Sequence, residues 1–171
     1  MIQFEELRHV RFGPWPQEQP GGAGTVTLTA RTSDPHELIA RCIEVMTALL
    51  EETTQPWPSP DTWAQVLPSW FVNRCAPENT PEEHSAWHAR WRGLNQDRRM
   101  IEARTRPWSL SDWLHWLEPD ERTWYWWHAA TDGAREARIE VTVPGWPAPL
   151  GSLEWLLKAC GAEYVELPED I

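Results

Sequence analysis

The sequence contains few cysteines and no long hydrophobic run. Cys42, Cys75 and Cys160 are odd in number, lie far apart and fall in apolar stretches, so a disulfide framework is not expected. No apolar run approaches the roughly 18 residues that a membrane span needs, and no basic-then-apolar segment follows Met1. We therefore expect a reduced, cytoplasmic protein that does not enter a membrane.

Motifs that identify an enzyme are also lacking. There is no Gly-x-Ser-x-Gly elbow and no phosphate-binding glycine loop followed by Lys. The glycine-rich segment 21–24 precedes a predicted strand, which is the wrong context for dinucleotide binding. Cys42 and Cys160 lie on predicted apolar helix faces, where a thiol is usually inert, and no base partner can be named for Cys75. We predict no catalytic residue and no cofactor.

One histidine pair has the spacing of a metal site. His84 and His88 are four residues apart on a predicted helix, so two imidazoles could bind one ion. Ser85 stands where a zinc hydrolase has Glu. The other histidines offer no evident third ligand: His9, His36, His115 and His128. We therefore predict no metal and interpret the pair as solvated or partly buried.

Acidic residues outnumber basic ones, 26 to 15, and the formal net charge is −11. Residues 1–56, 57–107 and 108–171 carry net charges of −4, +1 and −8. An acidic field repels nucleic acid and anionic membranes and attracts basic partners, although a well-solvated surface would also explain it. Residues 90–106 contain six Arg flanked by tryptophans, a pattern that can bind single-stranded nucleic acid. We instead expect this stretch to pair internally with the acidic C-terminal third.

Tryptophan is abundant: the chain has 14, and five of them lie between Trp113 and Trp127. Trp124, Tyr125, Trp126 and Trp127 would make both faces of one strand aromatic, so the strand is either covered on both sides or lines a groove. We favour a core role. A stacking platform for a sugar, a base or a cation is the alternative.

Capping signals predict about five helices. Asp34-Pro35 and Thr80-Pro81 are typical helix starts, and Gly161 is a typical stop. Pro68 is expected to kink the second helix. The predicted helices span residues 34–50, 59–71, 80–93, 109–117 and 152–160.

Alternating apolar residues predict the strands. Residues 2–12 and 25–31 are expected to form a β-hairpin across 2–31 with a long loop, and residues 122–130 and 137–143 a second hairpin turning at Asp132-Gly133. A last strand is predicted at 163–167, and 95–107 is predicted to be an Arg-rich connection. The expected fold is one α+β domain over 1–171, with a helical section at 34–93, an α-β-β-α-β section at 108–167 and an antiparallel or mixed sheet.

We interpret the chain as a non-catalytic, intracellular protein-binding domain. The leading hypothesis is an immunity-type inhibitor that masks a basic protein, such as a nuclease-like toxin. Carboxylates would steer and pair with the partner's Lys and Arg, and tryptophans would supply buried contact area. The predicted partner-binding residues are Asp112, Trp116, Glu118, Asp120, Glu121, Asp132 and Trp146.

Two alternatives come from other classes. One is a small-molecule or carbohydrate-processing enzyme, with the aromatic strand lining its pocket and carboxylates such as Glu118, Asp120 and Glu121 nearby. The other is a structural subunit of a larger assembly, whose tryptophans would be broadly exposed. The sequence does not determine the oligomeric state.

Overall fold

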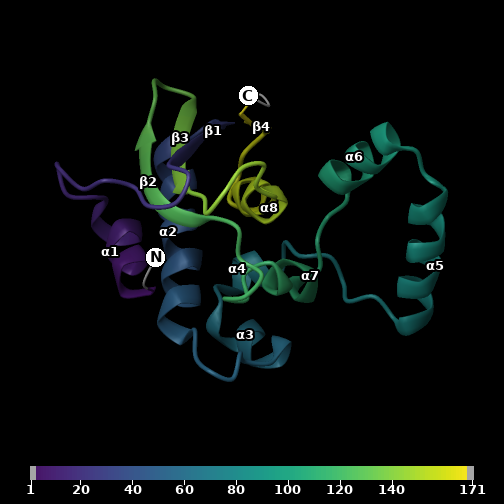
Figure 1. Cartoon of the computed structure of the whole chain (residues 1–171). Coiled ribbons are helices and arrows are strands. Elements are labelled where there is room, and N and C mark those ends of the chain that lie inside the picture. Colours follow the sequence, from purple (N-terminus) through teal and green to yellow (C-terminus); the bar gives the residue numbers. More distant parts are fainter. Residues whose placement is uncertain (1–2, 169–171) are drawn as a thin grey trace.

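The strands of the computed structural model form one antiparallel sheet in the order β2-β3-β1-β4 (Figure 1). The structure describes residues 3–168, without the side chains of Gln96, Met100 and Ala103. The strands are β1 (Thr25–Arg31), β2 (Tyr125–Thr131), β3 (Glu136–Thr142) and β4 (Tyr164–Glu166). The described residues also form eight helices, so the predicted single α+β domain is confirmed.

The helices outnumber the five predicted ones. They are α1 (Gln3–Phe12), α2 (Pro35–Glu52), α3 (Pro60–Val66), α4 (Ser69–Val72), α5 (Pro81–Gly93), α6 (Gln96–Thr105), α7 (Leu110–His115) and α8 (Gly151–Ala159). Two of them, α1 and α6, fall where no helix was predicted, and α3 and α4 divide one predicted helix at Pro68, which is the N-cap of α4. None of the described helices is long and apolar enough to cross a membrane.

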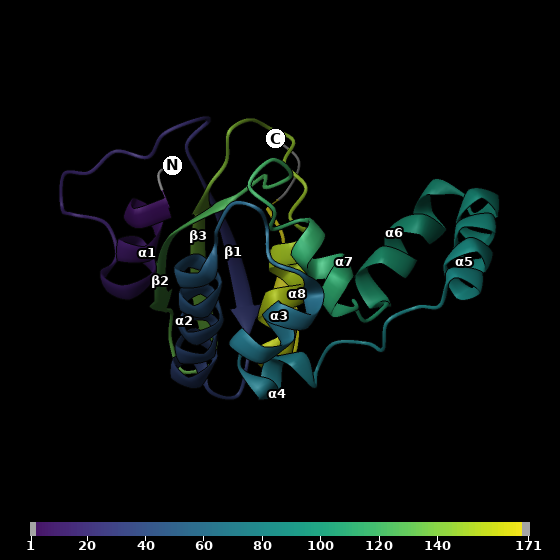
Figure 2. The same cartoon turned by 90° about the horizontal axis from the view of Figure 1, so that it is seen from below.

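The sheet buries one face beneath helices. Leu28 and Ala30 of β1 and Ile139 of β3 are fully buried, whereas Thr27 and Arg138 on the alternate positions are exposed. Helix α2 packs on β2 and β3, and α8 packs on α2 and β4 (Figure 2). The core therefore lies between this face of the sheet and helices α2 and α8, and it continues among α3, α4 and α7.

Capping residues position the helices as the sequence predicts. The Asp34 side chain accepts a hydrogen bond from the Glu37 N–H at 3.0 Å and begins α2. At α5, Thr80 and Glu83 form a reciprocal capping box. Each cap satisfies backbone N–H groups that a helix start leaves without a partner. These predicted helix starts are confirmed.

The predicted strand at residues 2–12 is wrong, because residues 3–12 form helix α1. Of the apolar residues that suggested a strand, Phe4 and Phe12 are 76% and 80% exposed. The buried face consists of Glu6, His9 and Val10, which recur at helical spacing. Residue 2 lies outside the described residues. Strand β1 therefore has no partner in 3–12, and it pairs with β3 and β4 instead.

The predicted connection at 95–107 is also wrong, because it contains helix α6. Asn95 caps this helix, its side chain accepting a hydrogen bond from the Arg98 N–H at 2.9 Å. The segment lacks an apolar stripe, so hydrophobic periodicity gives no signal for it. Helices α5 and α6 lie side by side at one end of the molecule, away from the sheet (Figures 1 and 2).

Candidate partner-binding surface

The aromatic strand belongs to the core. Trp124 and Trp126 are each 1% exposed and Trp127 is 6% exposed. The register between β2 and β3 shifts between Trp126 and His128, so two consecutive side chains are buried in different surroundings. Trp126 lies in the main core, and Trp127 packs against His9 of α1 with ring centroids 4.5 Å apart. The core interpretation of these tryptophans is confirmed.

Two of the predicted partner-binding residues are tryptophans that remain accessible. Trp116, at the end of α7, is 37% exposed, and Trp146, in the loop after β3, is 38% exposed. One indole exposed to this extent is ordinary on a protein surface. Two exposed tryptophans beside acidic groups have the composition that is typical of a protein interface.

The structure brings most of the predicted carboxylates to the same end of the β2–β3 hairpin. Glu118 is partly exposed, and Asp120 and Glu121 are exposed in the turn between α7 and β2. A hydrogen bond of 2.7 Å from the Thr123 hydroxyl to the Pro149 carbonyl ties this turn to the loop that carries Trp146. We call Asp112, Trp116, Glu118, Asp120, Glu121 and Trp146 together the acidic surface.

Asp132 does not belong to this surface. It follows the last residue of β2, whereas Glu121 precedes the first, and the seven-residue strand separates them by about 20 Å. Strand length alone could have shown this, because the two ends of a strand cannot meet. The remaining six predicted residues keep their candidate role.

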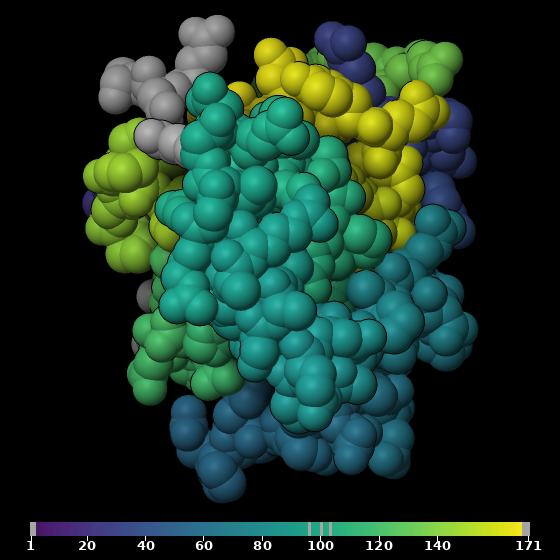
Figure 3. Space-filling model, turned by 90° about the vertical axis from the view of Figure 1, so that its right-hand side faces the viewer, coloured from purple at the N-terminus to yellow at the C-terminus, as the bar shows by residue number. Residues whose placement is uncertain are grey.

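Next to the acidic surface is a cleft that sequence reasoning missed. It has a volume of about 550 Å³ and lies between the α5–α6 pair and α7 and α8. Asp112 and Trp116 line it. The four tryptophans in its walls, which define what we call the Trp cleft, are Trp87, Trp91, Trp108 and Trp116. Figure 3 views the molecule from the side where α5 and α6 lie in front of the rest of the chain.

Arginines of the chain already stack on two of these tryptophans. The Trp87 and Trp91 rings are 4.8 Å apart and nearly parallel, at 22°. The Arg106 guanidinium lies 4.6 Å from the Trp87 ring centroid, and the Arg99 guanidinium lies 5.8 Å from that of Trp91. Cation–π stacking of this kind stabilises the α5–α6 pair without a buried apolar core. Trp87 and Trp91 are four residues apart, so the sequence already indicated that they share one helix face and could form one wall of a cleft.

Several arginines of residues 90–106 pair within the chain. Arg90 forms an ion pair with Glu102, and Arg99 donates to the Trp91 and Arg92 carbonyls at the end of α5. At the other end of α6, Arg104 pairs with Glu154 of α8 at 3.2 Å. Among residues 3–168, this last pair is the one that reaches the acidic C-terminal third, so the predicted internal pairing holds in part.

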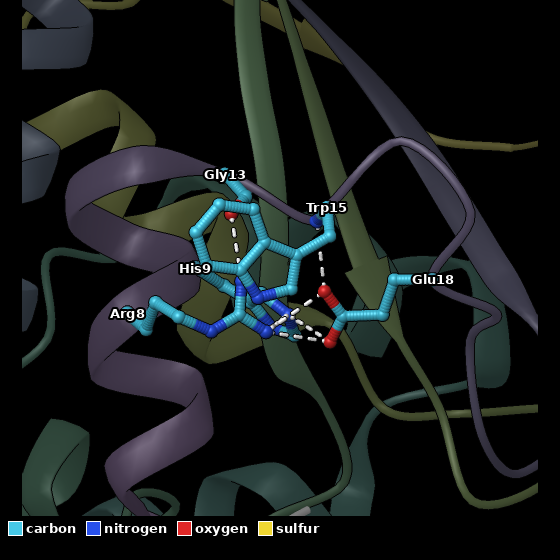
Figure 4. A network of polar contacts seen from close by, with 5 residues as sticks. All are labelled: Arg8, His9, Gly13, Trp15 and Glu18. Carbon is cyan, nitrogen blue, oxygen red and sulfur yellow. Dashed lines mark hydrogen bonds and ion pairs between the residues drawn. The ribbon is translucent and has the colours of Figure 1, made fainter.

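A second cavity, of about 370 Å³, lies beside α1 and is lined by Trp127, Tyr125, His9 and Glu18 among others. Glu18 accepts hydrogen bonds from Arg8 at 2.6 and 2.8 Å and from the Trp15 N–H at 2.8 Å, and it contacts His9 at 2.7 Å (Figure 4). These donors, Arg8 foremost, lower the pKa of Glu18 from 4.5 to about 2. A carboxylate so firmly ionised cannot serve as the general acid that a glycosidase needs.

Because the pKa of Glu18 is lowered, we expect the stability of the fold to be sensitive to acid. Because its folded-state pKa lies below its ordinary value, the stabilisation it contributes is present above about pH 4.5 and is lost as the pH falls toward 2. Glu18→Gln should lower the thermal midpoint at neutral pH and flatten the loss of stability between pH 5 and 2. Thermal unfolding across this pH range measures both effects, and a variant with the wild-type pH profile would contradict the assignment.

Two of the three thiols have raised pKa values. Burial raises the pKa of Cys75 to about 11, with Glu78 adding to the shift, and burial beside Cys160 raises that of Cys42. Thiols with raised pKa values are poor nucleophiles. Over residues 3–168, no group of three or more His, Cys, Asp or Glu side chains is arranged to hold a metal ion.

This chain matches no protein-family model, no curated protein and no solved structure.

Proposed function

We propose that this chain is a non-catalytic binding domain of the immunity type, which acts in the cytoplasm and masks a basic protein such as a nuclease-like toxin. The observation that carries this proposal is the acidic surface itself. Two accessible tryptophans lie among four carboxylates on neighbouring segments. Aromatic anchors within a charged rim are typical of protein interfaces.

The Trp cleft extends this surface. A basic partner would place a Lys or Arg side chain against its indole rings, in the way that Arg106 already lies on Trp87. Asp112 and Trp116 belong to both the cleft and the acidic surface, so one partner segment could engage them together. The net charge of −11 would speed its association by electrostatic steering.

Two variants with the same change in charge test this proposal. The surface variant carries Glu118→Lys, Asp120→Lys and Glu121→Lys. The control variant carries Asp132→Lys, Glu163→Lys and Glu166→Lys, three exposed acids elsewhere on the chain. Wild type and both variants are immobilised and exposed to lysate of the cells that express the protein, at low and moderate salt, and retained proteins are identified by mass spectrometry.

We expect one basic protein to be retained stoichiometrically by the wild type and the control variant, and to be lost as salt rises. The surface variant should bind it at least about tenfold more weakly, because rim charges govern association. Equal retention on all three proteins would contradict the assigned surface. The absence of any retained basic protein would contradict the proposed function.

The Trp cleft also favours a second candidate, recognition or processing of a small neutral ligand such as a carbohydrate. Indole rings stack on sugar rings, and 550 Å³ is within the size range of small-molecule sites. The charges of Glu102, Asp112 and Arg106, which line the cleft, nearly cancel, as suits a neutral ligand. Titration with oligosaccharides, followed by tryptophan fluorescence, distinguishes this candidate. Saturable quenching that Trp91→Ala abolishes would favour it over a protein partner.

A further inference from the structure

Two histidines on the wall of the Trp cleft converge on one point. The Nε2 atoms of His84 and His88 lie 2.9 Å apart, and their ring centroids are separated by 4.4 Å. Both side chains are exposed, and both line the cleft. The two nitrogens therefore already face one another in a position that a solute can reach.

The local sequence holds this geometry in place. Residues four apart share a helix face, and α5 continues for more than one turn after His88, to Gly93. Its first turn is fixed by the capping box, with Thr80 N–H donating to Glu83 at 2.8 Å and Glu83 N–H donating to Thr80 at 3.2 Å. The helix backbone thus presets the distance between the two imidazoles before any ligand arrives.

We propose that His84 and His88 form a two-histidine site for a borderline divalent transition-metal ion such as Cu²⁺ or Zn²⁺. Each Zn–N bond is about 2.0–2.1 Å long, so two nitrogens on a tetrahedral ion are about 3.3 Å apart. The observed separation of 2.9 Å needs to widen by only a few tenths of an ångström. The sequence analysis noted the spacing of this pair but predicted no metal, because spacing shows neither the convergence of the nitrogens nor their place in a cleft.

The chemistry of the ligands determines which ions fit. Neutral imidazole suits Cu²⁺, Zn²⁺ and Ni²⁺, and Cu²⁺ binds most tightly in this series, whereas Mg²⁺ and Ca²⁺ prefer oxygen ligands. The described residues place no third His, Cys, Asp or Glu ligand beside the pair. The remaining coordination positions therefore take water or an incoming group that enters the Trp cleft. The two histidines line the Trp cleft but lie outside the acidic surface, so metal binding can be tested independently of partner binding.

The test uses Cu²⁺ and the full chain without a histidine tag. The Trp87 ring lies edge-on to His88 with centroids 5.6 Å apart, so bound Cu²⁺ should quench tryptophan fluorescence. Calorimetry gives the stoichiometry and affinity in parallel. We expect one ion per chain, with His84→Ala and His88→Ala each weakening binding by roughly 100-fold, because either variant removes the chelate.

His36→Ala is the matched control, since His36 is also an exposed helical histidine but has no partner at helical spacing. It should bind Cu²⁺ like the wild type, and Mg²⁺ should not compete. The proposal is overturned if the wild type binds Cu²⁺ no more tightly than His84→Ala or His88→Ala, or if His36→Ala loses as much affinity. Circular dichroism confirms that each variant is folded, as expected for exposed positions.

Discussion

Replacing Glu6 by Ala is expected to lower the free energy of unfolding by about 3–5 kcal/mol, because it leaves a buried arginine without its counter-charge. Glu6 is 1% exposed, and its carboxylate accepts two hydrogen bonds from Arg122, at 2.7 and 2.9 Å. It also accepts the Trp126 N–H at 2.8 Å. The Arg122 guanidinium lies over the rings of Trp124 and Tyr125, so it has little room to reach water.

Chemical denaturation of the wild type and the variant measures this loss. Glu5→Ala is the matched control, because Glu5 is the exposed neighbour on the same helix and its removal should change stability by no more than about 0.5 kcal/mol. The double variant Glu6→Ala, Arg122→Ala should be little less stable than Glu6→Ala alone, since the two side chains act as one pair. A loss below about 1 kcal/mol for Glu6→Ala would show that the pair is not as buried as its geometry indicates.

The ion pair between Glu6 and Arg122 also explains why the sequence pattern predicted a strand where the structure has helix α1. Sequence patterns identify a helix by its apolar face, but the buried face of α1 includes a carboxylate and an imidazole. Their partners, Arg122 and Glu18, lie 116 and 9 residues away from them along the chain. The burial of Glu6 depends on a partner far along the chain and so leaves no local signal. The apolar residues Phe4 and Phe12 suggested a strand instead.

Helix starts and turns that depend on neighbouring residues were predicted correctly. The caps at Asp34 and Thr80 satisfy backbone groups within three residues, and both helices begin there. The turn at Asp132 and Gly133 likewise joins β2 and β3 as predicted, with Gly133 at a φ of 80° that favours glycine. Strand pairing between β1 and β3 could not be predicted, because it joins segments about a hundred residues apart.

The candidate site, like the fold, could be predicted from the sequence only where its residues are close together along the chain. The carboxylates of the turn before β2 are close in sequence, so their clustering followed from the chain itself. The Trp cleft required α5 to be placed against α7 and α8, and none of the α5 residues is buried to indicate such packing. Half-exposed tryptophans on a polar helix resemble ordinary surface residues until their neighbours are known.

Trp113→Ala is expected to lower the free energy of unfolding by about 3–5 kcal/mol and to disturb the acidic surface as well. Trp113 is fully buried, and its ring lies 4.8 Å from that of Phe71. Its indole N–H donates to the Ser152 carbonyl at 3.0 Å, while Trp124 donates to the Ser152 hydroxyl at 2.8 Å. Through Ser152, these two tryptophans join α7 and the segment just before β2 to α8.

Because α7 carries Asp112 and leads directly to Trp116, the same variant should also weaken binding of the basic partner, even under conditions where it remains folded. Chemical denaturation and partner affinity measure the two effects separately. Trp113→Phe keeps most of the packing and loses only the N–H, so it should cost less stability than Trp113→Ala. Trp15→Ala removes an indole that is 65% exposed and serves as the control. If Trp113→Ala lost stability but kept full affinity, the surface would have to be held by the turn before β2 rather than by α7.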